Sequence, residues 1–148
     1  RREGVRLMHS GSLEDIPAPL ADKVVRAVQA TRANREYTLN VAFNYGGRKE
    51  ILRAAQQILR DRISPDALSE ELVERYLYTA GLGDMDLVIR TGGDQRLSNF
   101  FPWQAARGVF YSTPTYWPDF DARALRAALE AYDRFWLERA EWDATSDV

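Results

Sequence analysis

Residues 37–59 read YTLNVAFNYGGRKEILRAAQQIL, and their pattern changes abruptly from that of a strand to that of a helix. Residues 37–43 are β-branched, aromatic or apolar, which predicts a buried strand. Residues 44–47 are turn formers, and from residue 48 to about 59 the apolar residues recur at the spacing of an amphipathic helix. A strand that leads through a short turn into a helix is the repeating unit of α/β proteins.

The same alternation extends in both directions along the chain. Short apolar runs predict further strands, and segments with helical periodicity, several of them after a proline or a serine, predict further helices. The predicted strands are residues 5–8, 85–89 and 109–112. The predicted helices are residues 20–31, residues 69–79, and a last helix from 121 to 136 or beyond. We therefore expect an α/β fold with a mostly parallel sheet flanked by helices on both faces.

The residue types that the chain lacks narrow its chemistry. It has 148 residues, no cysteine and one histidine, which excludes a disulfide scaffold or a thiol nucleophile and argues against zinc sites and Ser-His-Asp triads. The net charge of −2 argues against a general nucleic-acid binder. Among the 20 cationic residues only Lys23 and Lys49 are lysines, and the arginine fork suits phosphate and carboxylate recognition.

Two loops that follow predicted strands carry residues suited to anions. In the first, residues 44–48 (NYGGR), paired glycines allow positive φ angles, and the following helix offers free N–H groups to an anion. A tight turn from strand to helix also needs glycine, so both interpretations stay open for this loop.

The second loop, residues 90–99 (RTGGDQRLSN), is richer in donors. Arg90, Arg96 and Ser98 surround a pair of glycines, and together they supply two positive charges and many hydrogen-bond donors to one small anion. The alternative is an arginine that only caps the strand or pairs with Asp94. A cluster of nearby aromatic residues would either wall a hydrophobic cleft or pack the core.

Three stretches, in matching order and spacing, resemble the cis-prenyltransferase family of the undecaprenyl diphosphate synthase type. They are residues 39–48 (LNVAFNYGGR), 86–100 (DLVIRTGGDQRLSNF) and 117–120 (WPDF). The resemblance implies the α/β fold of that family, incomplete at its N-terminus, with residues 1–148 forming the C-terminal part of a single domain.

The resemblance implies an enzyme that transfers prenyl groups. Members of this family condense isopentenyl diphosphate onto an allylic diphosphate such as farnesyl diphosphate, giving a Z-polyprenyl diphosphate. By resemblance, Arg90, Arg96 and Ser98 hold the isopentenyl diphosphate, and the backbone near Leu97 assists. Asp94 stands where the family usually has glutamate.

The resemblance also implies Mg²⁺, but it assigns no metal ligand to this chain. We expect the allylic diphosphate loop (Asp-Gly-Asn-Gly-Arg), the Asn-Trp-x-Arg stretch and the catalytic residues in an N-terminal part that precedes Arg1. Val109 occupies the position of a family glutamate, and an aliphatic side chain offers no oxygen to a hard cation. The usual Arg-x-Gly ending is missing from residues 134–148.

These departures leave two alternatives to an active synthase: a non-catalytic partner subunit, or an inactive fragment. The intact loop at residues 90–98 favours a synthase, although we expect the isolated 148-residue chain to be inactive. The resemblance further implies a homodimer in the cytoplasm, without nucleic acid, that contacts the membrane peripherally through its lipid product.

Overall fold

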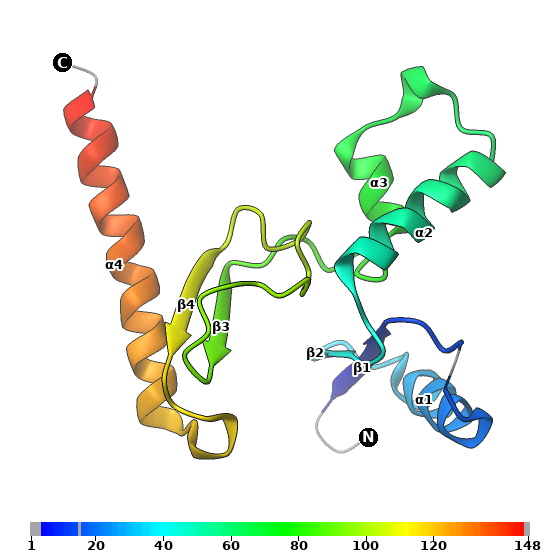
Figure 1. Cartoon of the computed structure of the whole chain (residues 1–148), viewed down its shortest axis with the longest axis horizontal. Coiled ribbons are helices and arrows are strands. Elements are labelled where there is room, and N and C mark those ends of the chain that lie inside the picture. Colours follow the sequence, from blue (N-terminus) through cyan, green and yellow to red (C-terminus); the bar gives the residue numbers. More distant parts are fainter. Residues whose placement is uncertain (1–3, 15, 147–148) are drawn as a thin grey trace. The chain divides into compact units, whose positions relative to one another are not determined.

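The computed structural model describes residues 4–14 and 16–146, and the chain divides into two compact units, Arg1–Leu82 and Gly83–Val148 (Figure 1). Each unit contains one pair of parallel strands with a helix packed on it. The last two residues of the altered ending at 134–148 lie outside the described residues.

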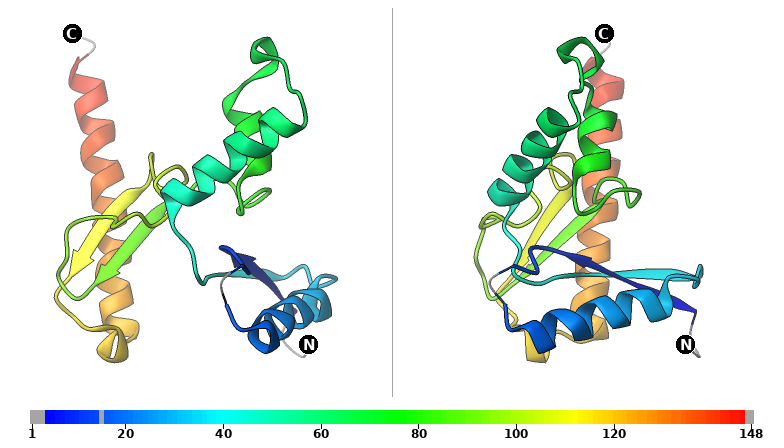
Figure 2. Two further views of the ribbon diagram at one scale, coloured as in Figure 1. Left: turned by 45° about the vertical axis from the view of Figure 1, so that its right-hand side comes forward. Right: turned by 90° about the vertical axis from the view of Figure 1, so that its right-hand side faces the viewer.

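The first unit begins with strand β1 (Val5–Ser10), helix α1 (Ala18–Thr31) and strand β2 (Tyr37–Ala42). The two strands pair in parallel from Val5 opposite Tyr37 to Ser10 opposite Ala42. Helix α1 contacts β1, and the last residue of the helix secures this packing because the Thr31 hydroxyl accepts a hydrogen bond from the Leu7 amide at 2.9 Å. Figure 2 shows α1 running alongside the strand pair.

Helix α2 (Gly47–Arg60) follows β2 and packs against helix α3 (Glu70–Tyr76). The segment that connects the two helices contains the short 3-10 helix η1 (Pro65–Ala67). The buried residues of α2, Gly47, Glu50, Ala54 and Ile58, lie on one face. Ser69 caps α3, since its hydroxyl accepts a hydrogen bond from the Leu72 amide at 3.2 Å. A hydrogen bond with the Ser69 side chain also lowers the pKa of Glu71.

Helix α3 ends at Tyr76, three residues before the predicted end at residue 79. The cause is the buried side chain of Glu50, whose Oε1 accepts a hydrogen bond from the Tyr78 amide at 2.7 Å. That amide is therefore used outside the helix, and Leu77 becomes extended and buried.

The second unit contains strand β3 (Leu87–Thr91) and strand β4 (Val109–Thr113), paired in parallel, followed by the 3-10 helix η2 (Trp117–Asp119) and helix α4 (Ala122–Ser146). Helix α4 lies against β4, as the views of Figures 1 and 2 agree. Its end at Ser146 agrees with the prediction of a helix that runs to residue 136 or beyond. The apolar core of this unit consists of Val88, Phe101, Ala105, Val109 and Ala128.

Parallel strands that alternate with helices confirm the predicted α/β class. The strands form two separate pairs, and within the described residues part of β2 remains uncovered: Tyr37, Leu39 and Val41 are exposed. Among the described residues, no helix combines the length and apolar content needed to cross a bilayer.

Candidate functional site

The arginine-rich loop begins where strand β3 ends. Arg90 is the fourth residue of β3, and it lies opposite Ser112 in the parallel register with β4. Ligands of open parallel sheets bind beyond the carboxyl ends of the strands, and residues 90–98 leave the sheet at that end.

Gly92 and Gly93 turn the chain sharply after the strand. Their φ angles are +87° and +82°, in the left-handed region that side chains disfavour. Both amides are anchored to the segment that continues β4: Gly92 N–H donates to the Thr115 carbonyl at 3.0 Å, and Gly93 N–H to the Thr113 carbonyl at 2.9 Å. The turn is therefore fixed at both residues, and it aims the rest of the loop back toward Arg90.

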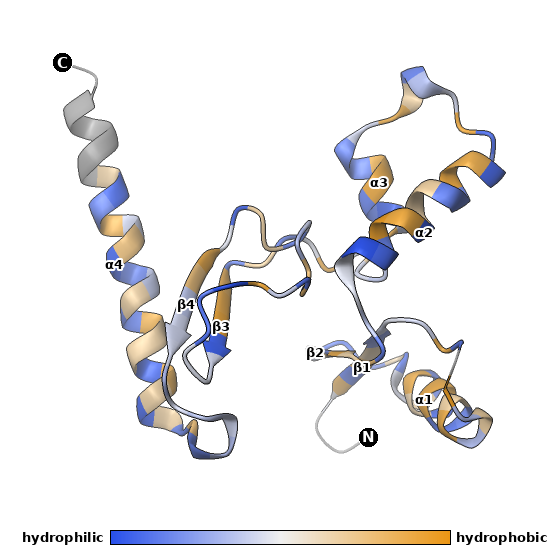
Figure 3. Ribbon diagram, viewed as in Figure 1, coloured by the Kyte–Doolittle hydropathy of each residue, from blue (hydrophilic) through white to orange (hydrophobic). Residues whose placement is uncertain are grey.

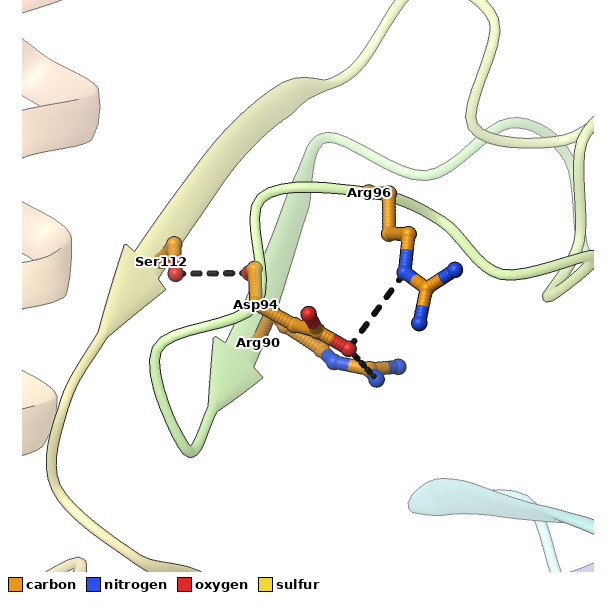
Figure 4. A network of polar contacts seen from close by, with 4 residues as sticks. All are labelled: Arg90, Asp94, Arg96 and Ser112. Atoms are coloured by element: carbon orange, nitrogen blue, oxygen red, sulfur yellow. Dashed lines mark hydrogen bonds and ion pairs between the residues drawn. The ribbon is translucent and has the colours of Figure 1, made fainter.

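Two arginines converge on one carboxylate in this loop (Figure 4). The Arg90 guanidinium donates to Oδ2 of Asp94 at 2.9 Å, and Nε of Arg96 lies 3.5 Å from the same oxygen. Two cations that share one oxygen create a point of strong positive potential, and Asp94 occupies it. The sequence alternative of an Arg90–Asp94 pair is thus present, together with the convergence of the two arginines.

The two arginines hold the Asp94 carboxylate too weakly for it to exclude another anion. The side chains of Arg90, Asp94 and Arg96 are 35%, 44% and 74% exposed, so solvent screens both pairs. Ion pairs at such exposure contribute about 1 kcal/mol or less. An incoming diphosphate carries more charge and more acceptor oxygens than Asp94, and it can take over both guanidinium groups.

Ser112 supports the network, and sequence reasoning missed it. Its hydroxyl donates to the backbone carbonyl of Asp94 at 2.7 Å, which ties the loop to β4 (Figure 4). The only signal in the sequence was a hydroxyl residue at the end of a predicted strand. Its partner became visible only once the parallel register placed it opposite Arg90.

Leu97 and Ser98 continue the loop. The Leu97 carbonyl accepts a hydrogen bond from Phe100 N–H at 2.9 Å, and Ser98 is exposed with a φ angle of +49°. Within the described residues, no contact joins the Ser98 hydroxyl to Arg90 or Arg96. The structure therefore brings together the two predicted arginines, and the role of Ser98 stays a prediction.

The first loop, residues 44–48, differs from its prediction in detail. Gly46 is extended (φ −159°) and precedes the helix, Gly47 is already helical, and Asn44 takes the left-handed conformation at φ +51°. The paired glycines therefore do not use the positive φ angles that glycine allows. Asparagine adopts this conformation more readily than most residues, so Asn44 can make the left-handed turn that either glycine could have made.

The residues around Val109 do not fit a magnesium site. Val109 is buried at the start of β4, and its amide donates to the Asp86 carbonyl at 2.9 Å. Magnesium requires oxygen ligands, which an aliphatic side chain does not supply. Across the described ranges no three His, Asp or Glu side chains gather in a way that could hold a metal ion.

The aromatic residues near the loop differ in burial, and the structure supports core packing for one of them. Phe101 belongs to the core at 2% exposure, whereas Tyr116 and Trp117 are exposed at 69% and 75%. Trp117 stacks on Phe120 with ring centroids 6.2 Å apart.

The fold and the loop together define an α/β protein with a cationic loop at the carboxyl end of a parallel strand. Residues 1–137 match the family described as "Putative undecaprenyl diphosphate synthase". The chain therefore belongs to the undecaprenyl diphosphate synthase family of prenyltransferases.

Curated relatives agree with this family. An isoprenyl transferase of Agrobacterium fabrum is 44% identical over 135 residues, which cover 88% of this chain and 55% of the relative. An isoprenyl transferase of Streptococcus mutans is 44% identical over 140 residues, covering 89% and 56%. The chain thus spans about half the length of the curated relatives it matches.

Solved structures show the same fold. Lavandulyl diphosphate synthase from Lavandula x intermedia, in complex with dimethylallyl diphosphate, matches with a TM-score of 0.79 and 34% identity over 86% of this chain and 57% of that chain. A probable undecaprenyl diphosphate synthase from Campylobacter jejuni matches with a TM-score of 0.79 and 28% identity over 89% and 61%.

Proposed function

We propose that the loop at residues 90–98 binds the diphosphate group of isopentenyl diphosphate in a cis-prenyl transfer reaction. The observation that carries the proposal is the convergence of Arg90 and Arg96 on a single oxygen of Asp94. An anion between two guanidinium groups is the arrangement that a diphosphate needs, and membership of a prenyltransferase family supplies the substrate class.

In the proposed reaction, the double bond of isopentenyl diphosphate attacks the carbon of an allylic diphosphate, such as farnesyl diphosphate. A carbon–carbon bond forms as the allylic carbon–oxygen bond breaks, and loss of a proton gives a Z double bond. Repeated rounds make a Z-polyprenyl diphosphate.

Arg90 and Arg96 contribute by orientation and by charge. They hold the nucleophilic substrate by its diphosphate, which places its double bond without a search through orientations. They also offset negative charge beside the reacting carbons. The residues around Val109 do not fit Mg²⁺, because an aliphatic side chain offers no oxygen ligand.

Binding of isopentenyl diphosphate by the 148-residue chain, measured by calorimetry, tests the proposal. We expect Arg90→Ala and Arg96→Ala each to weaken binding at least tenfold, since a hydrogen bond to a charged group contributes about 1.5–3 kcal/mol. Arg126→Ala, on the exposed surface of α4, is the matched control and should leave the affinity unchanged. Equal affinities for all three variants would refute the assignment.

Turnover is a separate question, because the chain spans only about half the length of its curated relatives. We propose that the isolated chain binds isopentenyl diphosphate without incorporating it into longer prenyl diphosphates. An assay with radiolabelled isopentenyl diphosphate and farnesyl diphosphate tests this, and incorporation above a no-protein blank would contradict it.

As the resemblance implies, the proposed enzyme is a cytoplasmic homodimer that contacts membranes peripherally.

A further inference from the structure

The first unit has a cavity lined by cationic residues, and none of its lining residues belongs to the loop at 90–98. The cavity, of about 740 Å³, opens where the loops after β1 and β2 meet one face of α2. Its lining includes Gly11–Glu14, Asn44, Gly46 and Tyr78 together with five residues of the helix. The cavity therefore lies beyond the carboxyl ends of two paired parallel strands. This is the general location of ligand sites in parallel α/β folds.

The two loops are tied to each other, so the wall is fixed. The Asn44 side chain donates to the Ser12 and Glu14 carbonyls at 3.0 and 3.1 Å, and the Ser12 amide donates to the Asn44 carbonyl at 3.2 Å. Gly11 must be glycine, because a Cβ there would collide with the Phe43 carbonyl oxygen. The cavity wall is thus held before any ligand arrives.

The helix presents a row of cations and amides to this cavity. Lys49, Arg53 and Arg60 line it together with Gln56 and Gln57. Their spacing places all five on one face of α2, beside the face formed by the buried residues Gly47, Glu50, Ala54 and Ile58. The first turn of α2, where the row begins, stands out as hydrophilic in Figure 3.

One of the three cations is fixed by the protein itself. The Arg53 guanidinium donates to the Tyr76 carbonyl at 3.1 Å and lies over the Tyr78 ring, 4.5 Å from its centroid. Among the described residues, neither Lys49 nor Arg60 has a carboxylate partner. Among the residues that the structure describes, three positive charges therefore line the cavity together with a single carboxylate, that of Glu14.

We propose that this cavity binds a diphosphate-class anion between Lys49 and Arg53. The two residues lie one turn apart, about 6 Å along the helix axis, so they can contact the two phosphoryl groups of one diphosphate. Arg60 lies about 16 Å from Lys49 along the axis, and its contribution is long-range. The proposal uses no residue of the loop at 90–98 and does not rest on the proposed function.

The lysine content of the chain gives a direct test. Lys23, exposed on α1 outside the cavity, and Lys49 are the only lysines, so amine modification followed by mass spectrometry compares a site residue with a built-in control. Inorganic pyrophosphate should slow modification of Lys49 and leave Lys23 unchanged, at an ionic strength held constant with sodium chloride. Equal protection of the two lysines, or no protection of Lys49, would overturn the proposal.

Charge variants test the same cavity by calorimetry with inorganic pyrophosphate. All are made in an Arg90→Ala/Arg96→Ala background, which removes the other proposed site. We expect about tenfold weaker binding for Lys49→Gln and a change of about twofold or less for Arg60→Gln. Glu14→Gln should bind about twofold to threefold more tightly, because it removes a negative charge from the lining. A variant that fails to fold would lose affinity, so tighter binding by Glu14→Gln can only come from the removed charge.

Failure of this proposal differs from failure of the proposed function. If the background variant binds no pyrophosphate, or if Glu14→Gln weakens binding, the cavity is not an anion site, whatever isopentenyl diphosphate does at Arg90. Isopentenyl diphosphate titrated into the same background distinguishes the source of the ligand. Binding as tight as that of pyrophosphate assigns the site to diphosphate esters, and weaker binding assigns it to free diphosphate; either supports the proposal.

Discussion

Asp94 accepts a hydrogen bond from Arg90 at 2.9 Å while the same carboxylate oxygen lies 3.5 Å from Arg96. The carboxylate therefore stands where the proposed function places a phosphate oxygen. Asp94 both draws the two arginines together and competes with the ligand that they would bind.

Competition predicts that Asp94→Asn binds isopentenyl diphosphate more tightly. The amide keeps the size of the side chain but removes the negative charge beside the ligand, and exposed charge pairs of this kind are worth up to about 1 kcal/mol. We expect affinity to rise by about twofold to fivefold in calorimetry at low salt, with the gain shrinking as salt is added. Weaker binding would show instead that Asp94 acts mainly by holding the arginines in place.

Ser112 is predicted to position the loop through the backbone carbonyl of Asp94. Ser112→Ala removes the 2.7 Å hydrogen bond between β4 and the loop, which is worth about 1 kcal/mol. We expect isopentenyl diphosphate to bind a few times more weakly, and the free energy of unfolding in urea to fall by about 1 kcal/mol. Ser112→Thr keeps the hydroxyl and should restore the affinity; if threonine and alanine behave alike, the hydroxyl has no positioning role.

The fold was predictable because its signals are local, and the site was predictable only in part for the same reason. The alternation of residues 37–59 specified a strand and a helix, and both are present. By contrast, the Ser112–Asp94 contact depends on the register of β4 against β3, and the early end of α3 depends on Glu50, 28 residues before Tyr78. Such contacts between distant residues leave no periodicity in the sequence.

Glu50 is predicted to be a major source of stability in the first unit. Its carboxylate is fully buried, and the Tyr45 hydroxyl donates to it at 2.5 Å. Tyr45→Phe leaves the buried carboxyl group of Glu50 with one donor fewer, which should lower the free energy of unfolding by about 1–3 kcal/mol in urea titration. Tyr37→Phe is the matched control, because that side chain is 71% exposed and should change stability little. Comparable losses in the two variants would contradict the prediction.

The Ser69 cap predicts a pH-dependent contribution from α3. The hydrogen bond with Ser69 holds the pKa of Glu71 below its usual value of 4.5, so this contribution is present above that value and is lost as the pH falls through the lowered pKa. Ser69→Ala should cost about 1 kcal/mol at pH 7 through loss of the cap and should flatten the acid limb of the stability profile. Ser69→Thr keeps a hydroxyl and should retain both effects. An acid limb unchanged in Ser69→Ala would contradict the coupling to Glu71.

The glycine pair after β3 predicts which loop substitutions the site tolerates. At Gly93 a Cβ would meet only ordinary contact, its nearest neighbour being the Pro114 Cα at 3.9 Å, so the cost of Gly93→Ala comes from the φ angle of +82°. That strain is worth about 1–2 kcal/mol. The variant can relieve this strain if the amide of residue 93 moves away from the Thr113 carbonyl, which would move Asp94 and Arg96 away from Arg90.

We therefore expect Gly93→Ala to weaken isopentenyl diphosphate binding by more than its loss of stability suggests, in calorimetry and urea titration on the same sample. Gly93→Asn should be milder on both measures, since asparagine tolerates the left-handed region better than alanine, and an alanine variant with unaltered affinity would show that the turn does not position the arginines.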